Sequence, residues 1–92
     1  MLNVPGGWKL AEMKPANLPE KAAMAFSDVI SSMVGAKYVP VLYCGEQPVH
    51  GTNYMIICEQ TLVVQGAPAH IVKMVINSSE QGNSIVQIEV IV

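Results

Sequence analysis

The side chains best suited to chemistry in this 92-residue chain are two cysteines, Cys44 and Cys58, and two histidines, His50 and His70. A thiol beside an imidazole is the pairing that creates a nucleophile for acyl transfer. Neither cysteine has the flanking signature of a catalytic thiol, and the sequence offers no third residue to orient the imidazole. The spacing gives no set of three or four metal ligands. We therefore expect a binding protein and not an enzyme, with no metal and no cofactor.

The two cysteines are too few for a disulfide framework, and they do not form a Cys-x-x-Cys pair. Reduced, buried thiols are the expectation that follows. Cys44 and Cys58 nevertheless lie almost symmetrically about the segment 47–51. Antiparallel pairing on either side of that segment leaves open a cross-strand disulfide under oxidising conditions.

The segment Gln47-Pro48-Val49-His50-Gly51 lies between two runs that are typical of β-strands. A five-residue bend with an apolar tip and a terminal glycine predicts a projecting hairpin loop. Pro48 removes a backbone donor and stiffens the loop, while protonation of His50 would make binding through it sensitive to pH. Substitution of Val49 or Gly51 is expected to spare folding and to affect binding only.

Composition predicts one folded domain spanning residues 1–92, because 51% of the residues are apolar and 13% are charged. Five basic against seven acidic residues, without a Lys/Arg cluster, argue against a nucleic-acid partner. No run approaches the roughly 18 apolar residues that span a bilayer, so no membrane partner is expected. Residues 1–5 lack the basic region and long apolar stretch of a secretion signal, and we expect a cytoplasmic protein.

Residues 1–17 carry Pro5, Gly6, Gly7 and Pro15 without sustained periodicity, which predicts an extended N-terminal arm. Residues 7–13 are a candidate for a short edge strand.

One amphipathic helix of about 17 residues is expected after the arm. Asn17 or Leu18 is its expected cap, Pro19 suits its first turn, and Gly35 is placed to end it in a left-handed conformation. Its apolar stripe comprises Ala22, Ala23, Phe26, Val29, Ile30, Met33 and Val34.

The rest of the chain is rich in β-branched and aromatic residues and predicts an antiparallel sheet with short connections. Alternation places Tyr54, Ile56 and Cys58 toward the helix and leaves Met55 and Ile57 on an open apolar face. The fold class is therefore α+β, with the helix packed across one face of the sheet. Its strands are expected at 38–45, 53–64, 70–77 and 84–92, with turns at 65–69 and 78–83.

The segment 47–51 fits Gln-x-Val-x-Gly and continues into Thr52-Asn53-Tyr54, which resembles the first hairpin of the cystatin family of cysteine-protease inhibitors. Val4-Pro5-Gly6-Gly7-Trp8, followed by Ala11-Glu12-Met13-Lys14-Pro15-Ala16, is similar to the amino end of the stefin (type 1) branch. The order of these pieces covers almost the whole chain. The resemblance implies a cystatin-like fold, with one helix packed across a curled four- to five-stranded antiparallel sheet.

The resemblance also implies a function, the reversible and tight inhibition of papain-like cysteine proteases. In this family the arm and two hairpin loops form a wedge that blocks the active-site cleft without chemistry. The second loop of this chain lacks the Pro-Trp or Pro-Gly common in the family, and it carries Glu80, whose desolvation would weaken binding. By position, the protease-binding residues are Val4, Pro5, Gly6, Gly7, Gln47, Pro48, Val49, His50, Gly51, Glu80, Gln81 and Gly82.

A shared fold does not fix function, so a second hypothesis stays open. In it the chain is a non-inhibitory cystatin-fold binding module that self-associates, or binds a partner, through the open face around Met55 and Ile57. A monomer and a domain-swapped dimer are both compatible with the resemblance.

Overall fold

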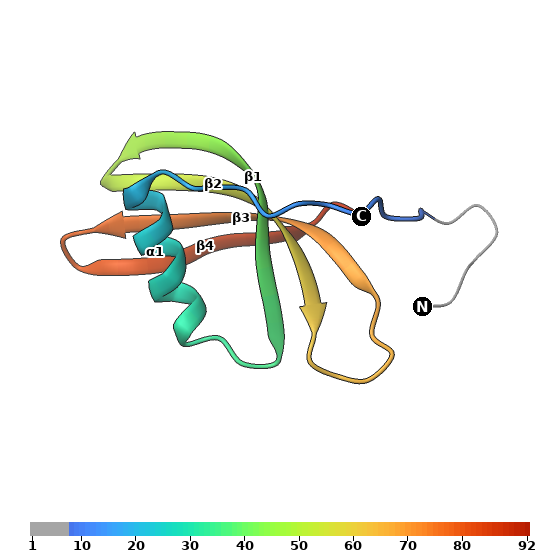
Figure 1. Ribbon diagram of the computed structural model, residues 1–92. Helices are drawn as coiled ribbons and strands as arrows, with labels where there is room; N and C mark the ends of the chain where they lie inside the picture. Colours follow the sequence, from blue (N-terminus) through green and yellow to red (C-terminus); the bar gives the residue numbers. More distant parts are fainter. Residues whose placement is uncertain (1–7) are drawn as a thin grey trace.

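The computed structural model describes residues 8–92 as one α-helix on a four-stranded antiparallel sheet (Figure 1). This arrangement confirms the predicted α+β class with a helix across one face of the sheet. The strands lie in the order β1-β2-β3-β4, and each neighbouring pair is antiparallel. The elements are α1 (Glu20–Ser31), β1 (Ala36–Val49), β2 (Gly51–Leu62), β3 (Ala69–Ser79) and β4 (Gly82–Val90).

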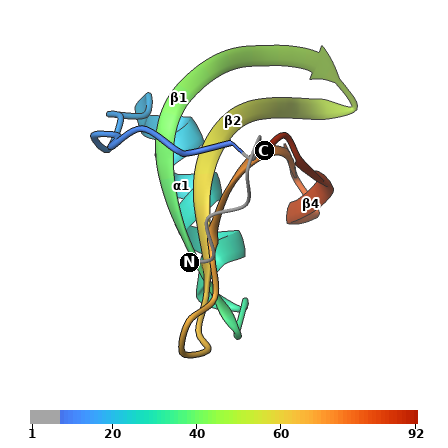
Figure 2. The same cartoon turned by 90° about the vertical axis from the view of Figure 1, so that its right-hand side faces the viewer.

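The sheet is strongly curled, and β1 and β2 arch over together toward their shared turn (Figure 2). The cause lies in β1, where pairing with β2 shifts register between Pro40 and Leu42 and again between Tyr43 and Gly45. Each shift inserts an unpaired residue, and such bulges bend a strand and increase its twist. The curl lets a sheet of only four strands wrap around a single helix.

Helix α1 is shorter than predicted at its amino end because Pro19 caps it and does not enter its first turn. Pro19 has an extended ψ of 150°, and its carbonyl oxygen accepts the first helical bond from the Ala23 N–H at 2.8 Å. The expected cap, Asn17 or Leu18, is therefore wrong, and the helix has no side-chain capping bond at this end. Glu20 in the first turn complements the positive end of the helix dipole, as predicted.

The carboxyl end of α1 is also earlier than predicted. The Ser31 hydroxyl donates to the Asp28 carbonyl oxygen at 2.7 Å, and the Ser32 hydroxyl donates to the Val29 carbonyl oxygen at 3.1 Å. Serine hydroxyls that bond to preceding carbonyls compete with the backbone and favour helix ends. Met33 and Val34 therefore lie outside the helix, and Val34 is 95% exposed instead of belonging to the apolar stripe.

The core lies between α1 and the concave face of the sheet. Tyr54, Ile56 and Cys58 of β2 are buried there, which confirms the predicted alternation. Ala25, omitted from the predicted stripe, is also buried, and with Ala22 it lets the helix approach the sheet closely. The buried core cluster comprises Ala22, Ala25, Val29, Tyr38, Tyr54, Ile56, Cys58, Val72, Met74 and Ile76.

Strands β1 and β3 are longer than predicted at both ends, whereas β2 and β4 each begin and end two residues earlier than predicted. The two hairpin turns are therefore shorter than predicted, and the connection between β2 and β3 is 63–68 instead of 65–69. Residues 8–13 do not form the suggested edge strand. Instead the arm crosses the sheet toward α1, and the Ala16 N–H donates to the Pro40 carbonyl oxygen of β1 at 2.9 Å (Figure 1). In the part of the chain that the structure describes, no helix has the length and apolar character needed to cross a membrane.

Truncation of the core is expected to destabilise the protein strongly. Ile56 is fully buried, so Ile56→Ala should lower the free energy of unfolding by about 2–5 kcal/mol through lost burial and a cavity. Met24→Ala is the control, because Met24 is 66% exposed on α1 and its loss should change stability by less than about 0.5 kcal/mol. Urea denaturation measures both. Equal effects would contradict the assigned core.

Candidate functional site

The segment 47–51 is not the five-residue loop that the sequence predicts. Gln47 pairs with Asn53, Pro48 with Thr52 and Val49 with Gly51, so β1 and β2 stay in register to their very ends. His50 alone connects them. The motif therefore forms a narrow, fully paired hairpin whose tip exposes Val49 to 47% and leaves His50 exposed.

Gly51 lies against the neighbouring strand β3, and no other residue fits this position. Its φ is +87°, a conformation that L side chains rarely adopt. A Cβ on Gly51 would collide with the Ser78 carbonyl oxygen and would lie only 2.9 Å from the Ser79 Cβ. The expectation that a substitution here would spare folding is therefore wrong, because this glycine seats the hairpin tip on β3.

A chain of side-chain amides fixes the same hairpin from its open face. The Asn77 amide nitrogen of β3 donates to the His50 carbonyl oxygen at 3.2 Å and to the Asn53 Oδ1 at 3.0 Å. The Asn53 amide nitrogen donates in turn to the Gln47 Oε1 at 3.2 Å. Sequence reasoning missed Asn77, since its only signal is a polar residue near a strand end, 27 residues after His50.

The second hairpin turn lies beside the first. Ser79 pairs with Gly82, so Glu80 and Gln81 alone form the turn, which is tighter than the predicted 78–83. The Ser79 hydroxyl oxygen accepts the Gln81 N–H at 3.2 Å and fixes the turn. Because Ser78 and Ser79 also contact the Gly51 position, both turns lie at one end of the sheet. We call the exposed residues Val49, His50, Glu80 and Gln81 the hairpin rim.

The described part of the arm begins at the other end of the sheet. Trp8 and Leu10 line a hollow next to the start of β3, together with Gly66, Pro68, Ala69, His70 and Val92. The hairpin rim lies at the end of β3, roughly 30 Å further along that strand at about 3.3 Å per residue. Two parts of the predicted three-part wedge are thus brought together, whereas the described arm residues do not meet them. Val4, Pro5, Gly6 and Gly7 lie outside the described residues.

The open face of the sheet holds a hollow of about 510 Å³ with an apolar floor. Met55 is 38% exposed here because Gly45, its partner on β1, has no side chain to cover it. Ile57 is half-buried, so less apolar surface is exposed than the alternation predicts. The hollow is lined by Cys44, Gly45, Glu46, Gln47, Asn53, Met55, Val75, Val86 and Gln87.

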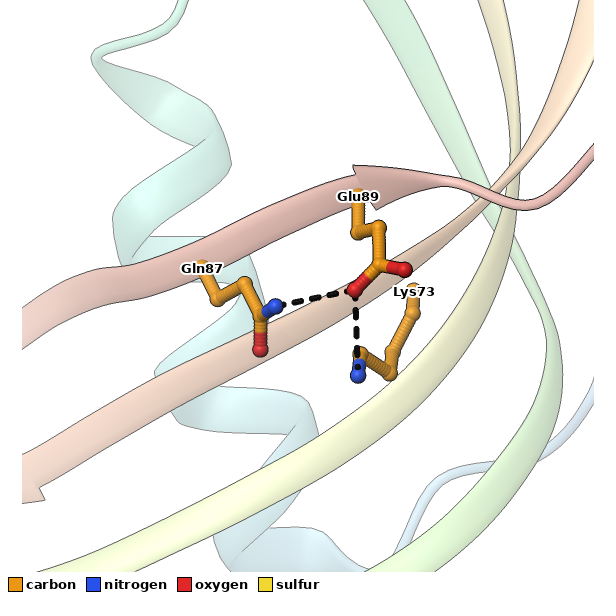
Figure 3. A network of polar contacts seen from close by, with 3 residues as sticks. All are labelled: Lys73, Gln87 and Glu89. Atoms are coloured by element: carbon orange, nitrogen blue, oxygen red, sulfur yellow. Dashed lines mark hydrogen bonds and ion pairs between the residues drawn. The ribbon is translucent and has the colours of Figure 1, made fainter.

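Three polar side chains, Lys73, Gln87 and Glu89, interact with one another further along β3 and β4 (Figure 3). The Lys73 Nζ lies 3.3 Å from the Glu89 Oε2, and the Gln87 amide nitrogen donates to the same oxygen at 3.0 Å. Both charged side chains are partly exposed, and such pairs contribute little to stability. They make this part of the open face polar.

The two cysteines lie on opposite faces of the sheet. Cys58 is buried in the core opposite Pro40, whereas Cys44 is exposed at a bulge and lines the open-face hollow. The suggested cross-strand disulfide is therefore wrong, as is the expectation that both thiols are buried. The bulges in β1 and the one-residue turn remove the apparent symmetry. Among residues 8–92, no three His, Cys, Asp or Glu side chains group as metal ligands would.

Gly51→Ala should lower the free energy of unfolding by about 3 kcal/mol or more, because it adds a backbone collision to an unfavourable φ. Gly66→Ala is the matched control. Gly66 also has a positive φ, +78°, but a Cβ there meets nothing within 4 Å, so only about 1–2 kcal/mol should be lost. Urea denaturation of both variants checks this. A loss at Gly51 no greater than at Gly66 would contradict the packing on β3.

The two thiols should differ sharply in reactivity toward a thiol reagent such as DTNB. Burial raises the pKa of Cys58 to about 12, so its thiol stays protonated at pH 8 and is also inaccessible. Cys44 is exposed and should react alone in the native protein. Both should react in denaturant. Two rapidly reacting thiols in the folded state, or none, would contradict this placement, and Cys44→Ser provides the control.

Comparison with protein-family models, with curated proteins and with solved structures finds no match to this chain. Two hairpin turns at one end of a curled sheet, with an open-face hollow beside them, are therefore the features from which a function can be assigned.

Proposed function

We propose that this protein is a reversible, tight-binding inhibitor of papain-like cysteine proteases, with a stefin-type cystatin fold. The observation that carries the proposal is the hairpin rim. The Gln-x-Val-x-Gly motif forms a one-residue turn, seated on β3 through Gly51, that leaves Val49 47% exposed. A narrow, rigid, apolar projection of this kind suits insertion into a groove.

Inhibition by this rim is blockade and requires no reaction. The apolar side chain of Val49 gains free energy when the walls of the cleft desolvate it. Because pairing between β1 and β2 and the contact with β3 already order the tip, docking loses little conformational entropy. Protease–inhibitor interfaces of standard size, about 1,600 Å² in total, reach high affinity when they are preorganised in this way.

The turn Glu80–Gln81 widens the projection beside Val49 and His50. Glu80 carries the only full negative charge of the hairpin rim, and burial of an unpaired carboxylate opposes binding. The proposal therefore requires that Glu80 remain hydrated at the margin of the interface or meet a cationic group of the protease. This requirement makes the second turn a source of selectivity between proteases.

The N-terminal arm is included in the proposal because of its sequence and not because of the geometry of the hairpin rim. Val4, Pro5, Gly6 and Gly7 are assigned to the protease interface by resemblance alone. Trp8, which follows them, lies with His70 and Val92 at the start of β3, away from the hairpin rim. The geometric support for inhibition therefore comes from the two hairpin turns.

A binding module that acts through the open face is the second candidate. The hollow beside Met55 and Gly45 favours it, because an apolar floor with polar walls suits a protein or peptide side chain. Self-association through the same face is one form of this candidate. The two candidates use different surfaces, and substitutions separate them.

Titration of active papain with the protein tests the proposal directly. We expect stoichiometric loss of peptidase activity, and Val49→Asp should weaken inhibition by at least about 100-fold because it places a charge in a desolvated contact. Met55→Lys is the control on the open face and should inhibit like the wild type. Full peptidase turnover with the wild-type protein in large excess would exclude inhibition of this enzyme class. Loss of binding in Met55→Lys, with Val49→Asp unaffected, would favour the open face.

A further inference from the structure

We infer that Asn77 is a positioning residue of the hairpin rim and that it acts through a directed relay of amides. Gln47, Asn53 and Asn77 are direct cross-strand neighbours on β1, β2 and β3. Their side chains lie in one row on the open face, and the amide nitrogens of Asn77 and Asn53 each donate to the next side chain toward β1. Only the part of this inference that concerns protease binding rests on the proposed function.

The relay begins with the only amide that holds the turn itself. Both hydrogens of the Asn77 amide nitrogen are used, one on the His50 carbonyl oxygen at 3.2 Å and one on the Asn53 Oδ1 at 3.0 Å. His50 is the sole residue between β1 and β2, so fixing its carbonyl oxygen fixes the peptide plane of the turn. Asn77 thereby joins the tip to β3, a strand with five buried residues in the sheet interior.

The relay ends at the exposed edge of the sheet. The Asn53 amide nitrogen donates to the Gln47 Oε1 at 3.2 Å, and this bond determines which way round the Gln47 amide lies. Because the oxygen is taken up by Asn53, the Gln47 amide nitrogen faces away from β2. Strand β1 is one of the two edge strands and Gln47 is exposed, so its two N–H donors are presented to a partner.

The relay therefore specifies the chemistry that the partner must supply beside the tip. Gln47 presents its two N–H donors outward, so the matching group on the protease is a hydrogen-bond acceptor, such as a main-chain carbonyl oxygen. A chain of polarised amides strengthens donation at its end. Asn77, on the third strand of the sheet, thus controls a contact made on the first.

Two variants separate the parts of the relay, and a third controls for charge. Asn77→Asp keeps the shape of the side chain but removes both donors, which should free the tip. Gln47→Glu still accepts from Asn53 but replaces the outward N–H donors with a carboxylate oxygen. Ser84→Asp adds the same charge on β4, opposite Asn77 and outside the relay.

Hydrogen exchange of the backbone amides in residues 49–53, relative to those in the centre of β3, reports on the tip without any protease. Asn77→Asp should accelerate exchange at the tip about 10- to 30-fold, as expected for two lost hydrogen bonds. Gln47→Glu and Ser84→Asp should leave it within about twofold. Unchanged exchange in Asn77→Asp, or equal acceleration in Ser84→Asp, would overturn the positioning role.

The inhibition constant for papain reports on the outward donors. Asn77→Asp and Gln47→Glu should each raise it about tenfold or more, the latter without a change in exchange at the tip. Ser84→Asp should stay within about threefold of the wild type. Wild-type affinity in Gln47→Glu would overturn the assigned direction of the Gln47 amide. If the wild-type protein does not inhibit papain, the proposed function fails, while the exchange experiment still decides the role of Asn77.

Discussion

The contact between Gly51 and the backbone of β3 is the constraint on which the functional end of this molecule depends. A two-stranded ribbon is marginally stable by itself in water. The β1–β2 ribbon is paired without interruption from Gly45 to its turn, but the turn would still be mobile without a third strand beside it. The absence of a side chain at Gly51 lets the Ser78 carbonyl oxygen approach, and Asn77 can then reach the His50 carbonyl oxygen. The missing side chain at Gly51 thus permits both the close packing and the hydrogen bonding at the tip.

The side of the sheet that faces the helix must bury the hydrophobic core. A chain of 92 residues can bury only a small core, and here one helix of 12 residues must cover it. Small residues on α1 bring the helix close to Ile56, Met74 and Ile76, which are fully buried. The curl of the sheet then brings more strand surface against the same short helix. Strand β3 serves both purposes, because Val72, Met74 and Ile76 belong to the core while Asn77, Ser78 and Ser79 at its end contact the hairpin tip.

Periodicity was sufficient to predict the helix, the four strands and the faces of Tyr54, Ile56 and Cys58, because burial enforces these patterns directly. Lengths of turns were not predictable in the same way. A run such as Gln47-Pro48-Val49 looks like a loop from its residue types, yet pairing with Asn53, Thr52 and Gly51 continues through it. The amide relay depends on register across three strands, which local sequence does not encode. Cys44 was misplaced for a related reason, since a bulge altered the alternation.

The bulges in β1 also govern which way its side chains face. Tyr38 and Tyr43 both pack against the core, although Tyr43 lies five positions after Tyr38. In an uninterrupted strand they would project to opposite sides, and the extra residue near Val41 corrects the alternation. The bulge at position 41 therefore adds to the bend of β1 without moving either tyrosine away from the core. Removal of position 41 would join Pro40 directly to Leu42, opposite the consecutive Cys58 and Ile57 of β2, so Tyr43 would still face the core while β1 lost one of the two bulges that curl it around the helix.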